Sequence, residues 1–176
     1  MRIVEASASD RADVLAVERA AFGGEVEAGL VADLLEDPTA RPLLSLLTRV
    51  NDRPVGHILF TAVRLEGAAV ELRLAILAPL AVVPDAQRSG VGGRLIERGI
   101  RLLGEAGVAL VFVLGHPGYY PRHGFEPAGR HGLAPPYPVS PEGAWMVRAI
   151  TPNVLGRAQG RVVCANALDR PEYWRE

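Results

Sequence analysis

Residues 82–100, VVPDAQRSGVGGRLIERGI, constrain the fold of this chain more than any other part of its sequence. An apolar strand ends at Pro84, glycines follow at positions 90, 92 and 93, and a helical pattern begins. Glycine permits tight turns and a close approach of the backbone. Because the first N–H groups of a helix lack partners and lie at its positive end, this turn predicts an anion site, above all a phosphate site. The alternative is a tight strand–helix connection that binds nothing.

Two nucleotide-binding folds that use such turns do not fit the sequence. A P-loop requires Gly-Lys followed by Ser or Thr, and the chain contains no lysine among its 19 basic residues. A dinucleotide-binding fold places the turn after the first strand of a βαβ unit and an acidic residue at the end of the next strand. Here several strands are predicted before the turn, and the strand that follows it ends in VLGHPG.

The periodicity of apolar residues along the 176-residue chain predicts a single α/β domain. Helices are expected at 10–22, 25–36 and 91–104, and strands at 2–6, 43–50, 55–65, 69–83, 108–114, 144–150 and 160–165. Residues 51–54 form the turn of a predicted hairpin. The segment 115–143 is rich in Gly, Pro, His and Tyr, which predicts a loop with one short helix.

Composition excludes several classes of protein. Cys164 is the only cysteine, so neither an intrachain disulfide nor a cysteine zinc cluster is available. The longest apolar run, residues 74–83, is too short to cross a membrane, and the charged N-terminus does not resemble a signal peptide. A net charge of −1 argues against binding of nucleic acid through the overall charge of the protein. These features predict a cytoplasmic protein.

Two motifs resemble those of the GNAT superfamily of N-acetyltransferases. The stretch Gln87-Arg88-Ser89-Gly90-Val91-Gly92 matches the signature Gln/Arg-x-x-Gly-x-Gly/Ala, with the preceding strand and the following helix also in place. Downstream, Tyr119-Tyr120-Pro121-Arg122-His123-Gly124-Phe125 resembles the Tyr-x-x-x-Gly-Phe segment that closes the family's cofactor site. The resemblance covers about residues 1–150, the GNAT domain, and leaves 151–176 as a C-terminal extension packed on the same domain.

The resemblance implies a mixed, mostly antiparallel sheet flanked by helices, in which two neighbouring parallel strands splay apart and admit acetyl-CoA. Those strands would be 77–83 and 108–114, with a bulge near Pro79. The freed backbone groups of Leu80, Ala81, Val82 and Val83 would pair with the pantetheine arm. The pyrophosphate would be held by the turn residues Gln87, Arg88, Ser89, Gly90, Val91, Gly92 and Gly93.

The implied reaction is acetylation of a primary amine by direct attack on acetyl-CoA in a ternary complex. A backbone N–H of Leu80 or Val82 would stabilise the oxyanion. Tyr120 lies where the family's general-acid tyrosine falls and would protonate the departing thiolate. The alternative for Tyr120 is packing beside the cofactor. We expect Tyr119 to pack there as well or to line the acceptor side.

At the position of the general base, the sequence departs from the family pattern. Ile76 occupies the position where some members carry glutamate, so a base must come from elsewhere or from water. His116 is the leading candidate, because an imidazole titrates in the useful range, and Glu71 and His57 are weaker ones. Each of the three also has an ordinary surface or loop role as its alternative. The spacing of His116, His123 and His131 fits no metal site, and no metal is expected.

The acceptor is less defined by the sequence. The resemblance implies that its groove is lined by Phe22–Glu25 and Leu133–Pro141. Glu25 and Glu27 either attract a cationic amine or simply form the solvated start of a helix. Tyr173 and Trp174 either dock on the domain or mediate a homodimer. Two function classes stay open: an N-acetyltransferase acting on a small molecule or a protein, and a non-catalytic acyl-CoA-binding or sensing module with the same fold.

Overall fold

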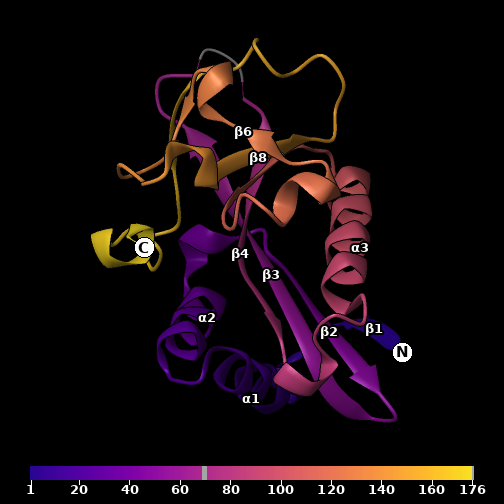
Figure 1. The fold of residues 1–176 in the computed structure, drawn as a ribbon. Helices are drawn as coiled ribbons and strands as arrows, with labels where there is room; N and C mark the ends of the chain where they lie inside the picture. Colours follow the sequence, from indigo (N-terminus) through magenta and orange to yellow (C-terminus); the bar gives the residue numbers. More distant parts are fainter. Residues whose placement is uncertain (69–70, 176) are drawn as a thin grey trace.

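The computed structural model describes residues 1–68 and 71–175. In this part of the chain nine strands form one sheet, and helices cover both of its faces (Figure 1). The helices are α1 (Arg11–Phe22), α2 (Val26–Glu36) and α3 (Val91–Glu105). The strands are β1 (Arg2–Glu5), β2 (Leu44–Val50), β3 (Arg53–Leu65), β4 (Arg73–Val82), β5 (Val108–Leu114), β6 (Glu126–Pro127), β7 (Leu133–Ala134), β8 (Trp145–Ala149) and β9 (Gly160–Val163).

The sheet is mixed and mostly antiparallel, as the sequence predicts. Its order is β1-β2-β3-β4-β5-β8-β6, and β9 pairs with both β3 and β7. The central pair β4–β5 is parallel, as is the short pair β7–β9, and the other pairs are antiparallel. No helix in the described part of the chain is long and apolar enough to span a membrane.

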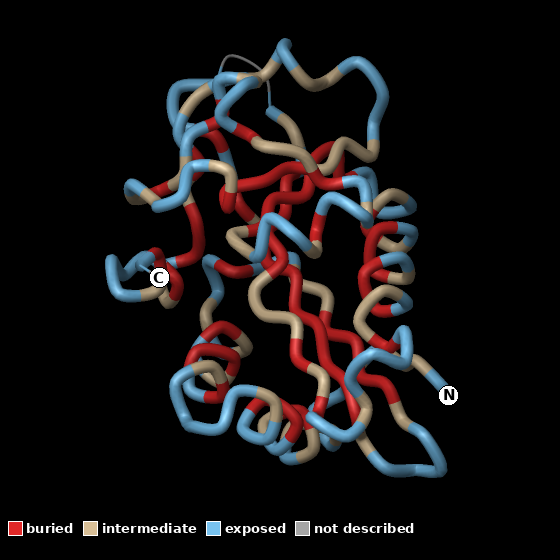
Figure 2. Tube along the Cα trace, viewed as in Figure 1, coloured by how far each residue is buried: buried red, intermediate tan, exposed pale blue. Residues whose placement is uncertain are grey.

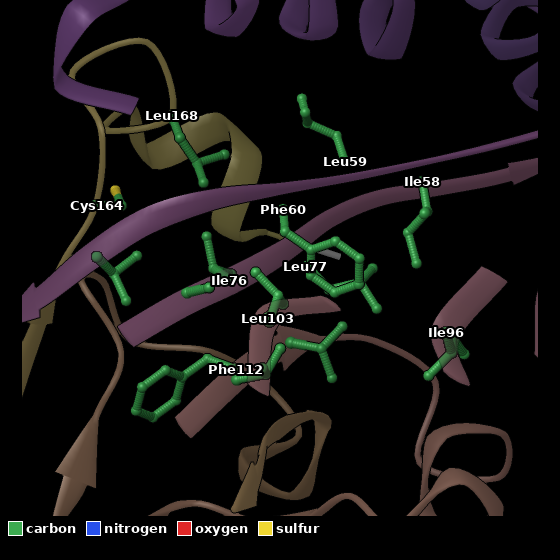
Figure 3. Close-up of a cluster of buried hydrophobic side chains, with 14 of the residues drawn as sticks. Ile58, Leu59, Phe60, Ile76, Leu77, Ile96, Leu103, Phe112, Cys164 and Leu168 are labelled. Carbon is green, nitrogen blue, oxygen red and sulfur yellow. The ribbon is translucent and has the colours of Figure 1, made fainter. Parts of the chain in front are cut away.

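Helix α3 covers one face of the sheet, and α1 and α2 cover the other (Figure 1). Alternation along β3 sends Ile58 and Phe60 toward α3 and Leu59 to the opposite face (Figure 3). Helix α3 packs so closely that a Cβ atom at Gly99 would lie 2.2 Å from the Phe60 ring. Residues on both faces of β3 and of the first half of β4 are therefore buried, whereas most of the second half of β4 is intermediate in exposure (Figure 2).

The hairpin between β2 and β3 turns more tightly than expected. Only Asn51 and Asp52 separate the strands, and both have positive φ angles, of 50° and 64°. Two left-handed residues are what a two-residue hairpin turn with the twist of the flanking strands requires. The predicted four-residue turn over 51–54 was therefore wrong, because Arg53 and Pro54 already pair with β2.

Strand β4 is irregular at the point where the sheet opens. Its register with β3 shifts between the pairs Phe60↔Leu77 and Ile58↔Leu80, which confirms the predicted bulge near Pro79. Its parallel pairing with β5 runs only as far as Leu77↔Val113. Beyond Leu77, one edge of the β4 backbone therefore has no neighbouring strand among the described residues.

Two other boundaries differ from the sequence prediction. The strand expected at 69–83 begins only at Arg73, and residues 69–70 lie outside the described residues. The segment 115–143, predicted as a loop with one helix, contains several 3₁₀ turns and the short strands β6 and β7. Strand β6 pairs with β8 at the edge of the sheet. Pairing between segments far apart in sequence produces this order, and no local pattern predicts it.

Candidate active site

The start of α3 presents a row of unpartnered amides. Among the described residues, no hydrogen bond is donated by the backbone N–H groups of 88–93, and the first helical bond is that of Arg94 to Gly90. Arg88 and Gly90 have positive φ angles, of 63° and 87°, which curl the turn ahead of the helix. The hydroxyl of Ser89 donates to Ala86 and the Gln87 side chain donates to Val82 O, so both side chains brace the turn. A cradle of this kind suits an anionic group such as a pyrophosphate.

A pocket of about 590 Å³ lies beside the opening between β4 and β5. One side of it is formed by Ile76–Leu80 of β4 and by Val113–His116 at the end of β5. Tyr119 and Tyr120 also line it. The pocket thus joins the unpaired edge of β4 to the tyrosine segment, which the sequence resemblance assigned to one cofactor site.

Only part of the backbone expected to be free on β4 is free. The N–H of Val83 donates to Val55 O of β3 at 2.9 Å, so the prediction that this N–H is available was wrong. Successive residues of a strand direct their backbone groups to opposite sides. The N–H groups of Leu80 and Val82 therefore face the open edge, whereas Ala81, like Val83, faces β3. The carbonyl oxygen of Val82 accepts from the Gln87 side chain at 3.0 Å, so the prediction that this C=O is available was also wrong.

Tyr119 and Tyr120 occupy different positions around the opening. A Cβ atom at Gly92 would lie 2.7 Å from the Tyr119 hydroxyl, so this side chain reaches the amide row of α3. Tyr120 is only 9% exposed, and its ring packs edge-on against Tyr119 and Phe125. Burial, with a smaller contribution from Tyr119, raises the pKa of Tyr120 above its usual value. Its hydroxyl therefore holds its proton at neutral pH.

Of the three residues considered as general base, His116, Glu71 and His57, only His116 lines the pocket. His116 lines the pocket, but its Nδ1 accepts the N–H of Gly118 at 3.0 Å. In a neutral ring with that bond, the proton resides on Nε2, so Nε2 donates and does not accept a proton. Ile76 also lines the pocket and is almost fully buried. Glu71 lines a different pocket, next to Arg64 and Arg73.

His57 is part of a buried chain behind the site. Its Nε2 and Nδ1 lie 2.8 Å from Ser45 Oγ and 2.7 Å from Glu18 Oε2, and neither His57 nor Glu18 has any exposed surface. Burial raises the pKa of Glu18, against the opposing effect of His57. Because His57 does not line the pocket and both its nitrogens are engaged, it does not meet the geometric requirement for a base.

Metal-ligating side chains do not gather in the described residues, where no group of three or more His, Cys, Asp or Glu could hold an ion. His131 lies 2.6 Å from Glu126 and forms a local pair with it. The lone Cys164 is buried, and burial raises its pKa to about 12, so it is not a reactive thiolate.

The far side of the pocket was predicted only in part: Phe22 and Glu27 were expected near the acceptor, whereas the contribution of the C-terminal residues to the wall was missed. This side is formed by Phe22, Val26, Glu27 and Leu30 near the α1–α2 junction and by the C-terminal residues Leu168 and Glu172–Arg175. None of the residues in Leu133–Pro141, expected to form a wall, lines it. The aromatic pair Tyr173-Trp174 was the one sequence signal that pointed to docking of this end of the chain.

Comparison with known proteins agrees with this architecture. The model of the acetyltransferase (GNAT) domain matches residues 45–127. The N-acetyltransferase YjhQ of Escherichia coli strain K12 is 50% identical over 161 residues, or 90% of this chain and 88% of that protein. YhbS of the same strain is 33% identical over 153 residues, or 87% of this chain and 89% of YhbS.

Solved structures give the same result. The crystal structure of YhbS from Escherichia coli in complex with CoA has a TM-score of 0.87 at 31% identity, covering 96% of this chain and 92% of that one. A GNAT family acetyltransferase from Brucella melitensis in complex with acetyl-CoA has a TM-score of 0.76 at 29% identity, with 96% and 97% covered. The fold is that of an acyltransferase. This chain belongs to the GNAT family of N-acetyltransferases.

Proposed function

We propose that the chain binds acetyl-CoA in the opening between β4 and β5 and transfers its acetyl group to a primary amine of a small molecule or a protein. The observation that carries this proposal is the end of β4–β5 pairing at Leu77, beside a helix start with unpartnered amides. The CoA and acetyl-CoA complexes of the two solved relatives support it.

Acetyl-CoA supplies a thioester that is already reactive toward amines, so the protein has to orient the reactants and stabilise charge. The amides of 88–93 hold the pyrophosphate, and the free edge of Leu80 and Val82 aligns the pantetheine arm. The same edge provides an N–H for the oxygen on which charge develops. Attack occurs directly from the amine bound in the pocket, in a ternary complex.

Tyr120 acts as the general acid in this proposal. Tyr120 lines the pocket, and a tyrosine hydroxyl carries its proton at neutral pH. It donates its proton to the sulfur as the carbon–sulfur bond breaks. The acceptor ammonium loses one proton to water before attack, and the second proton, released from nitrogen as the amide forms, returns through water to Tyr120. His116 lines the wall of the same pocket.

The replacement Tyr120→Phe tests this role, because it retains the ring packing and removes only the proton donor. We expect kcat to fall by roughly 10²-fold while the Kd of acetyl-CoA, measured by calorimetry, changes little. Tyr119→Phe is the matched control, since it removes the neighbouring hydroxyl of the same segment, and its effect on kcat should be much smaller. Full turnover by the Tyr120 variant would remove this residue from the mechanism.

The second candidate is a non-catalytic acyl-CoA-binding or sensing module. Ile76 favours it, because this buried apolar side chain leaves β4 without a proton acceptor facing the pocket. Release of thiol from acetyl-CoA in the presence of polyamines, aminoglycosides, amino acids and peptides separates the two. Binding of acetyl-CoA without thiol release for any amine would favour the module.

A further inference from the structure

The C-terminal segment, residues 168–175, is built into the pocket from a distant part of the chain. Two bonds anchor the residues just before it to the turn that follows α2: Ala167 N–H donates to Asp37 Oδ2 at 2.8 Å, and Asn166 N–H donates to Thr39 Oγ1 at 2.9 Å. Trp174 is 3% exposed, and its Nε1 donates to Leu168 O at 3.0 Å. The segment is therefore a fixed wall.

The wall and the α1–α2 junction that faces the same pocket present an unusual combination of side chains. Phe22 is 45% and Val26 66% exposed, and they are two of the four large hydrophobic residues exposed in the described part of the chain. Tyr173 adds a half-buried aromatic ring. An apolar surface gathered in a concave site favours a ligand with an apolar body.

Two carboxylates accompany this apolar surface. Glu27 comes from the first turn of α2 and Glu172 from the 3₁₀ turn Pro171–Trp174. Within residues 1–68 and 71–175 neither carboxylate forms an ion pair, in contrast to Glu25 and Glu36 nearby, which pair with Arg19 and Arg11. Arg175 also lines the pocket without contacting Glu172 as an ion pair, so it does not neutralise this charge by direct pairing.

We propose that the C-terminal segment determines acceptor specificity, and that Glu172 and Glu27 select an acceptor that combines a cationic amine with an apolar body. This inference rests on the proposed acetyl transfer and names the substrate class of the same site. The apolar body lies against Phe22, Val26 and Tyr173, and the ammonium is attracted by the two carboxylates. A volume of about 590 Å³, shared with the acyl end of the cofactor, fits a small molecule or one side chain of a peptide.

Binding of two probes to the protein with CoA present tests the selection of a cationic group separately from turnover. The probes are 4-phenylbutylamine and its neutral counterpart 4-phenylbutan-1-ol, measured by calorimetry. We expect the amine to bind more tightly than the alcohol, and added salt to reduce the difference. Equal affinities, or no binding of the amine, would overturn the proposal.

Substitutions of single charged residues test which side chains cause the preference for the amine. Glu172→Gln and Glu27→Gln should each weaken amine binding by about two- to fivefold, the scale of an exposed charge pair, and leave the alcohol and acetyl-CoA unchanged. Arg175→Gln should strengthen amine binding. The control is Glu142→Gln, an exposed glutamate in another 3₁₀ turn, outside the pocket. Unchanged amine affinity in the Glu172 variant would contradict the proposal.

Acetylation is then measured with the same amine. If the amine binds as expected and no thiol is released, the proposed transfer fails while the binding specificity stands. If the amine is acetylated and its KM is the same in wild type and in the Glu172 variant, the transfer stands and the specificity proposal fails.

Discussion

The row of amides at residues 88–93 depends on single residues, and at Gly92 there is no space for a larger side chain. A Cβ atom there would lie 2.7 Å from the Tyr119 hydroxyl and 3.5 Å from a methyl group of Leu80. Its φ angle is not in the left-handed region, so space and not backbone conformation requires glycine at this position. Even one added methyl group must displace Tyr119 from the row of amides proposed to hold the pyrophosphate.

We therefore expect Gly92→Ala to weaken acetyl-CoA binding by roughly tenfold, or about 1.4 kcal/mol, in calorimetry. Gly29→Ala is the matched control, because a Cβ atom at this exposed position in α2 meets nothing within 4 Å. The control should retain acetyl-CoA affinity and gain about 0.5–1 kcal/mol of stability, since alanine favours a helix interior over glycine. Equal affinity in both variants would argue against the cradle.

At the scale of elements, a buried polar chain links α1 to the sheet. Glu18 of α1 contacts His57 of β3, which in turn contacts Ser45 of β2, and Glu18 Oε1 has no hydrogen-bond partner in the described residues. Burial raises the pKa of Glu18 above its ordinary 4.5, and the nearby Glu27 raises it further. The native state therefore retains a proton on Glu18 at pH values where the unfolded chain has lost it.

This difference in proton binding predicts how stability depends on pH. Above pH 4.5 the unfolded state releases the Glu18 proton first, so the contribution of Glu18 to the free energy of unfolding falls as pH rises toward the raised native pKa. Urea unfolding of the wild type and of Glu18→Gln across this range should show the wild type losing stability relative to the variant.

The control for this measurement has the opposite sign. The pKa of Glu36, an exposed residue, is lowered by its contact with Arg11. Its contribution is present above the ordinary pKa and is lost as pH falls. Compared with Glu36→Gln, the wild type should therefore lose a little stability only as pH falls below about 4.5 and show no trend above it. A fall in the stability of the wild type relative to both variants above pH 4.5 would contradict the assignment of the pH dependence to Glu18.

At the scale of the whole molecule, the C-terminal segment closes the structure around the pocket. Trp145 of β8 stacks on Phe112 of β5 at 5.2 Å between ring centroids, and Trp174 packs on Trp145 at 5.7 Å. In the same region, Leu168 joins the core cluster on the α1–α2 face of β3 (Figure 3). Strand β9 connects this region to β3. We still predict that residues 151–176 fold as part of one domain with residues 1–150.

Trp174→Ala tests this arrangement. Loss of a nearly buried indole should reduce the free energy of unfolding by about 3–5 kcal/mol, in a single cooperative transition. Arg170→Ala, at an exposed position just before the same 3₁₀ turn, should stay within about 0.5 kcal/mol of wild type. A separate early transition for the C-terminal residues in urea would show that this segment folds independently of the domain.

Local sequence was sufficient for the elements whose pattern is strong. Helix α3 and strand β5 have the predicted positions within one residue. The apolar residues of α3 recur with the period of a helix, and β5 is a short unbroken apolar run typical of a buried strand. The Gly-rich turn and the Tyr-x-x-x-Gly-Phe segment identified the two sides of the β4–β5 opening for the same reason. Their spacing along the chain already includes the helix and the strand between them.

Tertiary structure decided the features that depend on residues far apart in sequence. Whether a backbone N–H of β4 is free depends on which side β3 occupies, and this engages Val83 and exposes Val82. The contact between Glu18 and His57 spans 39 residues, and Phe22 and Glu172 line one pocket from nearly opposite ends of the chain. Sequence alone determined the family and the cofactor motifs, because these are local. The shape and charge of the pocket arise only from packing, because no local pattern encodes which distant segments meet.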